Sequence, residues 1–599
     1  MSFDSLVYEM SNVSDVSPQV FVKKDWLSIL DNQSQNYSGN QCVIDTSQLS
    51  NSNKYMNYRE AYLSVPLLLT LNQTAVAVGI VPTVAATSCD YVLALKNWSG
   101  SLIHSLTLDY NGVTVIQQTG FQGIYNTFKL YCSMSMADVK AEGASIGFYP
   151  DDPLAFQLSQ AATVNGIGIS NNRNAQIASG PVVTGALNSY TSTNKGVAAR
   201  QMWINYDNDG LTGTGGGAFS LLNSQANINS LYKSSVLTKV DGTVGVIGVF
   251  QQQAMVQIKL KHLHSFFDNV PLLKGVFMRL TLNLNNTSFS FTSAGVGGVI
   301  TLNSVSAPYG GVNPLMLCSA AVGSGSVASL GAATYIASVC VGQRPLASGT
   351  VGVAGVANAT LASSITLNVP AYTFNPTFEA SYLSQPVKKV DYTDIYQYLI
   401  NSVSAGNGQI NSLVSNGIAG IQSVLVVPFL STTAAVAGNL GISVPQIQSP
   451  FDTAGTGTTA PLAMLTNFNV VIAGQNMIYN TQRYAYEQFM NQLYGQLAIN
   501  GGQTDGLASG LINSLAFETS QCFYYVRCDR MLPVEESIPK SVSIIGQNTS
   551  AYALDLFVFV EYSASISIDS LTGSRVQYSL YNNINKIEIN LKTLYSTIL

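Results

Sequence analysis

The sequence predicts an all-β fold with minor inserted helices, in which one β-sandwich is written twice in tandem. Charged residues make up only 10% of the 599-residue chain, against about 25% in typical soluble domains. The 50 glycines and 31 tyrosines, with many asparagines and valines, favour pleated strands and tight turns. A third observation is an internal echo of short motifs in the same order: Tyr62-Leu-Ser-Val-Pro66 and Ile124-Tyr-Asn-Thr127 are followed by Tyr382-Leu-Ser-Gln-Pro386 and Ile478-Tyr-Asn-Thr481.

Length and charge limit the classes of protein that the chain can belong to. At 599 residues it has room for two or three β domains of roughly 200 to 250 residues. The net charge is −5, and no basic run is present that would neutralise a phosphate backbone. We therefore expect no autonomous or sequence-specific binding of nucleic acid. A free monomer of this size with so few charges would be poorly soluble, so much of its surface is expected to be buried in an assembly.

Cysteine use and the terminal sequence favour synthesis in the cytosol. The seven cysteines include no Cys-x-x-Cys pair and are expected to be reduced and mostly buried; they are Cys42, Cys89, Cys132, Cys318, Cys340, Cys522 and Cys528. The first residues lack a signal-peptide pattern, and no apolar run approaches 18 residues. We expect no membrane span.

The first half is predicted to be one sandwich. Residues 1–56, which include Trp26, are interpreted as an N-terminal arm plus a first strand, and residues 57–370 as the first domain. Alternating apolar residues over 61–71 predict a core strand. Asn111-Gly112 between two alternating runs at 106–115 predicts a β-hairpin.

Two short helices are expected after this hairpin. The first carries Ile124 and Tyr125, and the second begins at Ser135, with Asp138 completing a capping box, and ends at Gly143. Residues 160–250 are interpreted as a long surface excursion with one strand at 202–206. Strands at 256–260 and 276–284 follow, joined by a turn-rich corner at 266–275 that contains Phe267 and Pro271.

Residues 292–370 are interpreted as short strands and loops that decorate one face. The second domain is expected at 371–599, with a helix through Ile410, Leu413 and Ile418 and strands at 424–429, 468–472, 554–562 and 564–568.

A helical insertion at 476–533 organises the second half. Tyr486, Phe489, Met490, Leu493 and Leu497 fall on one helical face, and a strand follows at 523–526. The insertion ends at Pro533 and matches the first-half segment 121–147. Each half thus reads as strands, hairpin, two helices and strands, and a tandem jelly roll satisfies this order.

Several motifs resemble catalytic or metal-binding patterns incompletely. Gly143-Ala-Ser-Ile-Gly147 has the spelling of a nucleophile elbow, but a helix is expected to end there and a strand to begin. His262 and His264 could share one face of a strand, yet neither they nor His104 have an evident third metal ligand. Asn205-Tyr-Asp-Asn-Asp-Gly210 copies half of a calcium loop, but Gly216 stands where a glutamate belongs.

The remaining patterns also favour ordinary structural interpretations. Gly213-Thr-Gly-Gly-Gly217 lacks the Lys-Ser/Thr of a phosphate-binding loop. The acids Asp151, Asp152, Glu535 and Glu536 are interpreted as turn and surface residues rather than as a glycosidase pair. No catalytic, cofactor-binding or metal-binding residue is assigned, and no cofactor is expected.

A set of longer motifs, distributed from about residue 20 to 576, carries a resemblance to a known family. They are Val22-Lys-Lys-Asp-Trp26, Glu60-Ala-Tyr-Leu-Ser-Val-Pro66, Ser145-Ile-Gly-Phe-Tyr-Pro150, Phe266-Phe-Asp-Asn-Val-Pro-Leu-Leu-Lys-Gly275, Asn375-Pro-Thr-Phe-Glu-Ala-Ser-Tyr382, Ser449-Pro-Phe-Asp452, Arg530-Met-Leu-Pro-Val-Glu535 and Leu571-Thr-Gly-Ser-Arg575. The sequence resembles the double jelly-roll major capsid proteins of double-stranded DNA viruses, most of all those of polinton-like viruses and more distantly those of virophages and adenovirus hexon.

This resemblance implies a non-enzymatic subunit of an icosahedral virion. It implies homotrimers whose six sandwiches form a pseudo-hexagonal capsomer, with other capsomers, penton and minor capsid proteins as partners. The structural landmarks expected to support the fold are Trp26, Tyr62, Pro66, Ile124, Tyr125, Asn126, Phe267, Pro271, Tyr382, Pro386, Ile478, Tyr479, Asn480, Phe489, Leu493 and Pro533. The alternatives are a carbohydrate-binding or adhesive β-sandwich protein and, third, a glycosidase.

Overall fold

The computed structural model describes most of both halves of the chain. The described residues are 19–33, 37, 39–50, 53–73, 91–150, 236–237, 249–275, 277–293, 300–319, 333–341, 364–432, 442–450, 464–479, 484–494, 510–519, 521–528, 538–569 and 575–579.

The first half folds into two facing antiparallel sheets. One contains β1 (Phe21–Leu30), β15 (Thr366–Phe374), β4 (Tyr62–Gln73) and β9 (Val249–Lys259), side by side in that order. The other contains β2 (Gln41–Asp45), β10 (Met278–Leu284), β6 (Ile103–Tyr110) and β7 (Val113–Ile116). Numbered along the chain, the sheets run 1-8-3-6 and 2-7-4-5, which is the strand order of a jelly roll.

The second half repeats this order. β16 (Val387–Val403), β23 (Leu554–Asp569), β18 (Ile421–Leu430) and β21 (Tyr524–Arg527) form one sheet, extended at β23 by β24 (Arg575–Ser579). The facing sheet contains β17 (Gly408–Ile418), β22 (Lys540–Asn548), β19 (Leu465–Ile472) and β20 (Gln475–Asn476). The chain therefore forms a double jelly roll. The strand order of the two halves confirms the predicted fold class.

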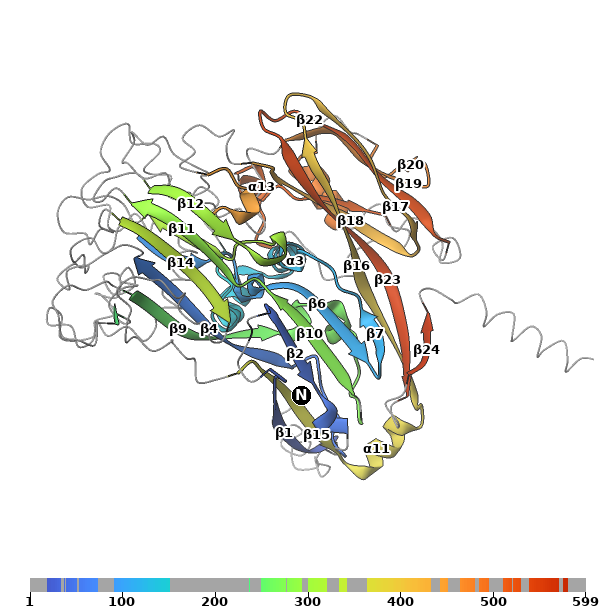
Figure 1. Ribbon diagram of the computed structural model, residues 1–599. Coiled ribbons are helices and arrows are strands. Elements are labelled where there is room, and N and C mark those ends of the chain that lie inside the picture. Colours follow the sequence, from blue (N-terminus) through green and yellow to red (C-terminus); the bar gives the residue numbers. More distant parts are fainter. Residues whose placement is uncertain are drawn as a thin grey trace, which may run out of the picture.

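Both rolls carry helices between their fifth and sixth strands. In the first roll these are α3 (Gln122–Ser133), α4 (Met136–Asp138), the π-helical turn Val139–Gly143 and α5 (Ala144–Ile146). In the second roll they are α12 (Tyr486–Leu493) and α13 (Ser514–Thr519). Figure 1 shows α3 between the two sandwiches, with α13 above it.

The first roll also has strands outside the repeated order. β11 (Thr287–Ser293), β12 (Ile300–Ser306), β13 (Leu315–Ser319) and β14 (Ala333–Val341) lie between its seventh and eighth strands. β14 pairs with the distal half of β4 and with β11, while β13 pairs with β5 (Tyr91–Leu95) and β8 (Val236–Leu237) with β9.

Short elements connect these strands. They are α2 (Ser47–Ser50), β3 (Tyr55–Met56), the 3-10 helices η1 (Ser99–Leu102), η6 (Leu260–His262), η7 (Pro308–Gly310) and η9 (Gln446–Gln448), and the helices α10 (Ser265–Asn269) and α11 (Pro376–Leu383). In Figure 1, α11 lies at the bottom of the molecule, where the chain passes from the first sandwich to the second.

Alternation in the sequence accounts for the cores. Ala61, Leu63, Val65 and Leu67 of the β4 segment are at most 2% exposed, as expected for a strand with one face on a core. The predicted hairpin is confirmed, because β6 and β7 pair across Asn111 and Gly112, whose φ angles are 46° and 79°. Positive φ at both positions is what a two-residue type I′ turn requires.

Two local helix predictions are corrected. The segment through Ile410, Leu413 and Ile418 is strand β17, which pairs with β22. Its few apolar residues are spaced in a way that does not distinguish the helical period of about 3.6 from the strand period of about 2. The capping box of Ser135 and Asp138 is confirmed, but the helix does not end at Gly143. Helical turns continue to Ile146, and Gly147, with φ 65°, ends them in the left-handed region.

The fold is repeated as the internal motif repeat predicts, but the repeated motifs themselves do not occupy equivalent positions in the two halves. Ile124 to Thr127 lie inside α3, whereas Ile478 and Tyr479 follow β20 outside any helix. Tyr62 and Pro66 lie in β4, whereas Tyr382 lies in α11 and Pro386 precedes β16. The repeated unit is the hairpin followed by helices, β6–β7 then α3 and β19–β20 then α12.

Three broader interpretations also change. Residues 1–56 contribute β1, β2 and β3, and so enter both sheets of the first roll rather than one strand. The range 292–370 includes much of the core strand β15 and the long strand β14, besides shorter strands. The expected strands at 554–562 and 564–568 are one strand, β23. The strand expected at 202–206 lies outside the described residues, and the domain limits stay predictions.

Candidate functional site at the junction of the two jelly rolls

Helix α3 joins the two rolls through aromatic side chains. Phe128 is fully buried, and its ring lies 5.1 Å from that of Phe523 and 5.3 Å from that of Tyr525, both in the second roll. At the start of the helix, the ring of Phe121 lies 4.9 Å from that of Phe557 on β23. The helix belongs to the first roll in sequence but completes the core of the second.

The second helical insertion meets the end of the same helix. The backbone N–H of Leu511 donates to the carbonyl of Tyr131 at 3.0 Å. At Gly510, φ is +52° and an added Cβ would lie 2.6 Å from the Tyr131 carbonyl oxygen, so only glycine fits there. The two insertions, matched in the sequence, are thus in direct contact.

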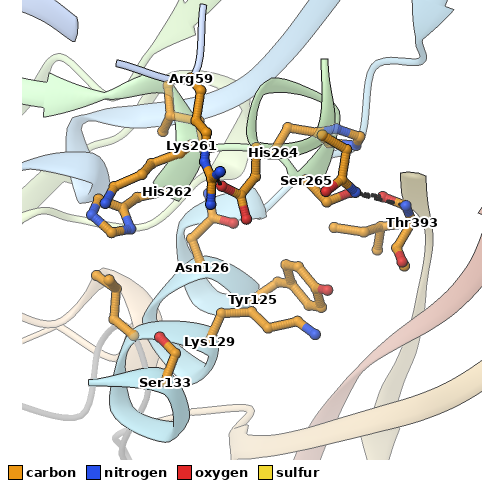
Figure 2. Close-up of a pocket in the computed structure, with 15 residues that line it drawn as sticks. Arg59, Tyr125, Asn126, Lys129, Ser133, Lys261, His262, His264, Ser265 and Thr393 are labelled. Carbon is orange, nitrogen blue, oxygen red and sulfur yellow. Dashed lines mark hydrogen bonds and ion pairs between the residues drawn. The ribbon is translucent and has the colours of Figure 1, made fainter. Parts of the chain in front are cut away.

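Strand β16 is attached to the first roll by hydrogen bonds. The hydroxyl of Tyr392 donates to the carbonyl of Val115 at 2.9 Å. Ser265 Oγ donates to the Thr393 carbonyl at 2.7 Å and accepts from the Thr393 N–H at 2.9 Å. The side chain of one residue therefore completes the backbone bonding of the other roll, as in Figure 2.

A buried polar network lies beside this contact. His264 Nε2 is 3.3 Å from Asp394 Oδ1, and both residues are at most 5% exposed. The N–H of Phe266 donates to His264 Nδ1 at 3.2 Å, so Nε2 is the nitrogen that carries the proton toward Asp394. The carboxylate also accepts from the Tyr562 hydroxyl at 3.0 Å and the Ile395 N–H at 2.8 Å, so it is well satisfied for a buried charge.

A cavity of about 600 Å³ opens between α3, the η6–α10 corner and β16. Its lining residues are Arg59, Tyr125, Asn126, Lys129, Leu130, Ser133, Lys261, His262, Leu263, His264, Ser265, Asp268, Asn269, Thr393 and Ile395. They come from both rolls, and Figure 2 shows Asn126 directed from α3 toward the side of the cavity that Arg59 and Lys261 occupy.

Glu142 organises the cations behind one wall of this cavity. Its Oε1 is 2.6 Å from Lys259 Nζ, 3.1 Å from His262 Nε2 and 3.9 Å from Lys261 Nζ. The hydrogen bond with His262, followed by that with Lys259, outweighs the opposing effect of burial and lowers the pKa of Glu142 to about 2. The carboxylate is therefore ionised at neutral pH.

An open groove of about 600 Å³ lies next to the cavity and shares Arg59 and Lys261 with it. Trp26 on β1 is 51% exposed, and its ring lies 5.6 Å from that of Tyr62 on β4. Glu60, Gln257 and Lys259 supply polar groups to the same groove. The exposed indole of Trp26 and the adjacent ring of Tyr62 give this groove an aromatic surface.

The residues expected to support the fold lie in different parts of the structure. Ile124, Tyr125, Asn126, Phe267 and Pro271 lie near the junction, and Pro66 pairs with Met255 inside the first sheet. Phe489 and Leu493 are buried side chains of α12, while Tyr479 is 86% exposed. Asn480, Pro533 and Leu497 lie outside the described residues. Phe128 was expected on the apolar face of the first helix, but its contacts with the second roll were not anticipated. Asp394 and Gly510 were not anticipated at all, because no local pattern reveals contacts made across several hundred residues.

The candidate chemistry motifs have ordinary structural roles where they are described. His262 ends η6 and His264 begins α10, so they do not share a strand face, and they bond to different carboxylates. Ser145 Oγ donates to the Glu142 carbonyl at 2.7 Å within the helical turns. The possible calcium loop, the glycine run at 213–217 and the acids at 151, 152, 535 and 536 lie outside the described residues.

His104 and five of the described cysteines are buried. Burial lowers the pKa of His104 to about 4, and its ring stacks on Tyr309 at 5.3 Å. Among the described cysteines, Cys42, Cys132, Cys340, Cys522 and Cys528 are buried and form no disulfide.

Among the described residues, no group of three or more histidine, cysteine, aspartate or glutamate residues is arranged to hold a metal ion. No helix in the same residues is long and apolar enough to cross a membrane.

Comparisons with solved structures give matches of low sequence identity over most of the chain. A chain of the Sputnik virophage is 12% identical, with 96% of this chain and 94% of that chain covered and a TM-score of 0.46. The mavirus major capsid protein is 10% identical, with 96% and 94% covered and a TM-score of 0.39. The PBCV-1 virus capsid gives 10% identity, 95% and 100% coverage and a TM-score of 0.38. No protein family matches the sequence, and no curated protein matches it.

Proposed function

We propose that the chain is the major capsid protein of a double-stranded DNA virus, a non-enzymatic subunit whose homotrimers form pseudo-hexagonal capsomers. The observation that carries the proposal is the repeated strand order, 1-8-3-6 facing 2-7-4-5, in two rolls of one chain. Three such chains supply six sandwiches, the number that a hexagonal outline needs. The motifs shared with double jelly-roll capsid proteins support the same reading.

The junction supports a role as a rigid building unit. Aromatic packing at Phe128 connects the rolls at one place, and the adjacent Thr393 and Asp394, bonded to Ser265 and His264, connect them at a second. Extensive apolar and hydrogen-bonded contact of this type opposes the relative motion that is usual between weakly joined domains. A shell subunit has to hold both sandwiches at a fixed angle.

Exposed apolar side chains support assembly with other copies. On β1, Trp26 and Leu30 point to one face and are 51% and 63% exposed. On the second roll, Leu413 and Ile538 are 54% and 58% exposed. A ring of identical subunits requires two different complementary surfaces on each chain, and we assign the β1 face to one of them.

The partners and location follow from this proposal. Neighbouring capsomers, a penton protein and minor capsid proteins would contact the trimer in the virion. The small number of charges suits buried subunit interfaces, whose cores are depleted in charged residues.

Variants of the β1 face test the assembly. Trp26→Glu with Leu30→Glu should leave the exposed strand folded but prevent trimer formation in light scattering. Lys23→Glu is the control, since it introduces the same side chain on the other face of β1, where Lys23 is also exposed. Trimers that survive the double substitution would remove the β1 face from the proposal.

One observation favours a carbohydrate-binding protein as the second candidate. The exposed ring of Trp26 beside Tyr62, in an open groove with Glu60 and Gln257, offers an aromatic platform with hydrogen-bonding groups around it. Selective binding on a glycan array that Trp26→Ala abolishes would favour this candidate. If the assembled protein binds no glycan, the groove would be assigned to contact between subunits.

A further inference from the structure

We propose that the cavity between the two rolls is a binding site for a phosphate group, held by Arg59, Lys261 and Asn126. The three side chains come from distant parts of the chain, namely the segment before β4, the η6 corner and α3. Only 26 of the 599 residues are lysine or arginine, and three of them, Arg59, Lys129 and Lys261, line this one cavity.

Of the three cations that line the cavity, Lys261 has the longest distance to a carboxylate oxygen. Its nearest carboxylate oxygen, Glu142 Oε1, lies 3.9 Å away, beyond hydrogen-bond distance. The same oxygen already binds Lys259 at 2.6 Å and His262 at 3.1 Å. The ammonium of Lys261 therefore keeps donors for a ligand in the cavity.

The guanidinium of Arg59 forms an ion pair through its Nε. Its Nε donates to Asp268 Oδ1 at 2.9 Å, which fixes the plane of the guanidinium. An arginine held in this way presents its terminal nitrogens as a fork suited to phosphate oxygens. Among the described residues that line the cavity, Asp268 is the only acidic one, and this bond already engages it.

Asn126 is the second, independent observation. It is only 4% exposed, it lines the cavity, and Figure 2 shows its amide directed toward Arg59 and Lys261. No hydrogen bond to a described residue satisfies this amide, although buried amides in proteins are usually bonded. Its N–H₂ group can donate to an anion that the two cations hold.

Other charges set the limits of the site. Lys129 also lines the cavity, but its Nζ is 3.1 Å from the buried Glu561, so we assign it to the junction between the rolls. Glu142 and Asp394 are engaged behind the wall by His262 and His264. A volume of about 600 Å³ accommodates a nucleotide or a short polyphosphate rather than a single ion alone.

Binding would link the two rolls thermodynamically. A ligand that binds only the assembled junction stabilises the folded chain in proportion to the logarithm of its concentration over its dissociation constant. The inference does not depend on the proposed capsid function, because it can be measured on monomeric and assembled protein alike.

The test is calorimetric titration of the full-length protein with tripolyphosphate and with ATP at low ionic strength. We expect saturable binding that added salt weakens. Lys261→Gln should weaken it about tenfold, and Asn126→Asp, which is nearly isosteric but brings a negative charge, should abolish it. Tighter binding of ATP than of tripolyphosphate would identify a nucleotide, and the reverse a free polyphosphate.

Lys274→Gln is the matched control. Lys274 is 27% exposed and 3.6 Å from Glu379, close to the 32% and 3.9 Å of Lys261, but it does not line the cavity. The Lys274→Gln variant should bind tripolyphosphate and ATP as tightly as the unaltered protein does. Absence of binding of both probes at millimolar concentration, or equal binding by the Lys261→Gln and Lys274→Gln variants, would overturn the proposal. If Asn126→Asp does not fold, the two lysine variants decide.

Discussion

The ring of Phe128, on the helix inserted in the first jelly roll, packs 5.1 Å from the ring of Phe523, which leads into β21 of the second. Each ring is fully buried. Two sandwiches that the sequence presents as separate domains therefore share aromatic core, and their stabilities should be coupled.

Phe128→Ala should lower the free energy of unfolding by about 3–5 kcal/mol, because it leaves a cavity where the two rolls meet. Urea unfolding followed by tyrosine fluorescence measures the effect. Phe128→Leu preserves most of the volume and should cost less than about 1.5 kcal/mol. An alanine variant with an unchanged unfolding midpoint would show that the rolls are stable independently of α3.

Asp394→Ala should cost about 3–5 kcal/mol, because it leaves the buried imidazole donor of His264 and the partly buried hydroxyl of Tyr562 without this acceptor. Asp391→Ala, on the same strand, is the control. Asp391 is 67% exposed and pairs with Lys389 at the surface, so its loss should cost less than about 1 kcal/mol. Equal effects in chemical denaturation would refute a structural role for the buried network.

Phe489→Asp combined with Leu493→Asp should abolish folding or trimer formation. Both residues are at most 1% exposed, and Phe489 lies 5.1 Å from Phe517 of α13, so two unpaired charges would be buried. Leu515→Asp, at a position 48% exposed on α13, should be tolerated. Soluble, assembly-competent protein carrying both charges would contradict the role assigned to α12.

The stability of the protein should decrease as pH falls from about 6.5 to about 4 because of His104. Burial lowers its pKa to about 4 in the folded state, from 6.5 ordinarily. In this window the unfolded chain binds the proton and the folded chain does not, so acid favours unfolding. His104→Phe should flatten this part of the curve of unfolding midpoint against pH. An unchanged slope in the variant would assign the effect to other groups.

Periodicity predicted the sheets well, because period-two alternation is imposed by the pleat itself. The strand at 61–71, the Asn111-Gly112 hairpin and the helical face of Tyr486, Phe489, Met490 and Leu493 were all recoverable locally. The β17 segment was not, since its apolar residues fit a helix as well as an edge strand.

The junction could not be predicted by the same means. In the sequence, Asn126 was noted only as part of a repeated tetrapeptide. Its position in a cavity depends on Arg59 and Lys261, which lie in other parts of the fold. His264 was noted for its spacing to His262, but its partner Asp394 lies on the other roll. Tertiary contacts of this kind leave no local period in the sequence.

The mass of the purified protein in solution, measured by light scattering with electron microscopy of the same sample, tests the central claim most directly. A double jelly-roll shell subunit should have about three times the 63.7 kDa of one chain and form particles with a hexagonal outline. Protein that stays monomeric at every concentration and forms no hexagonal particles would contradict the account.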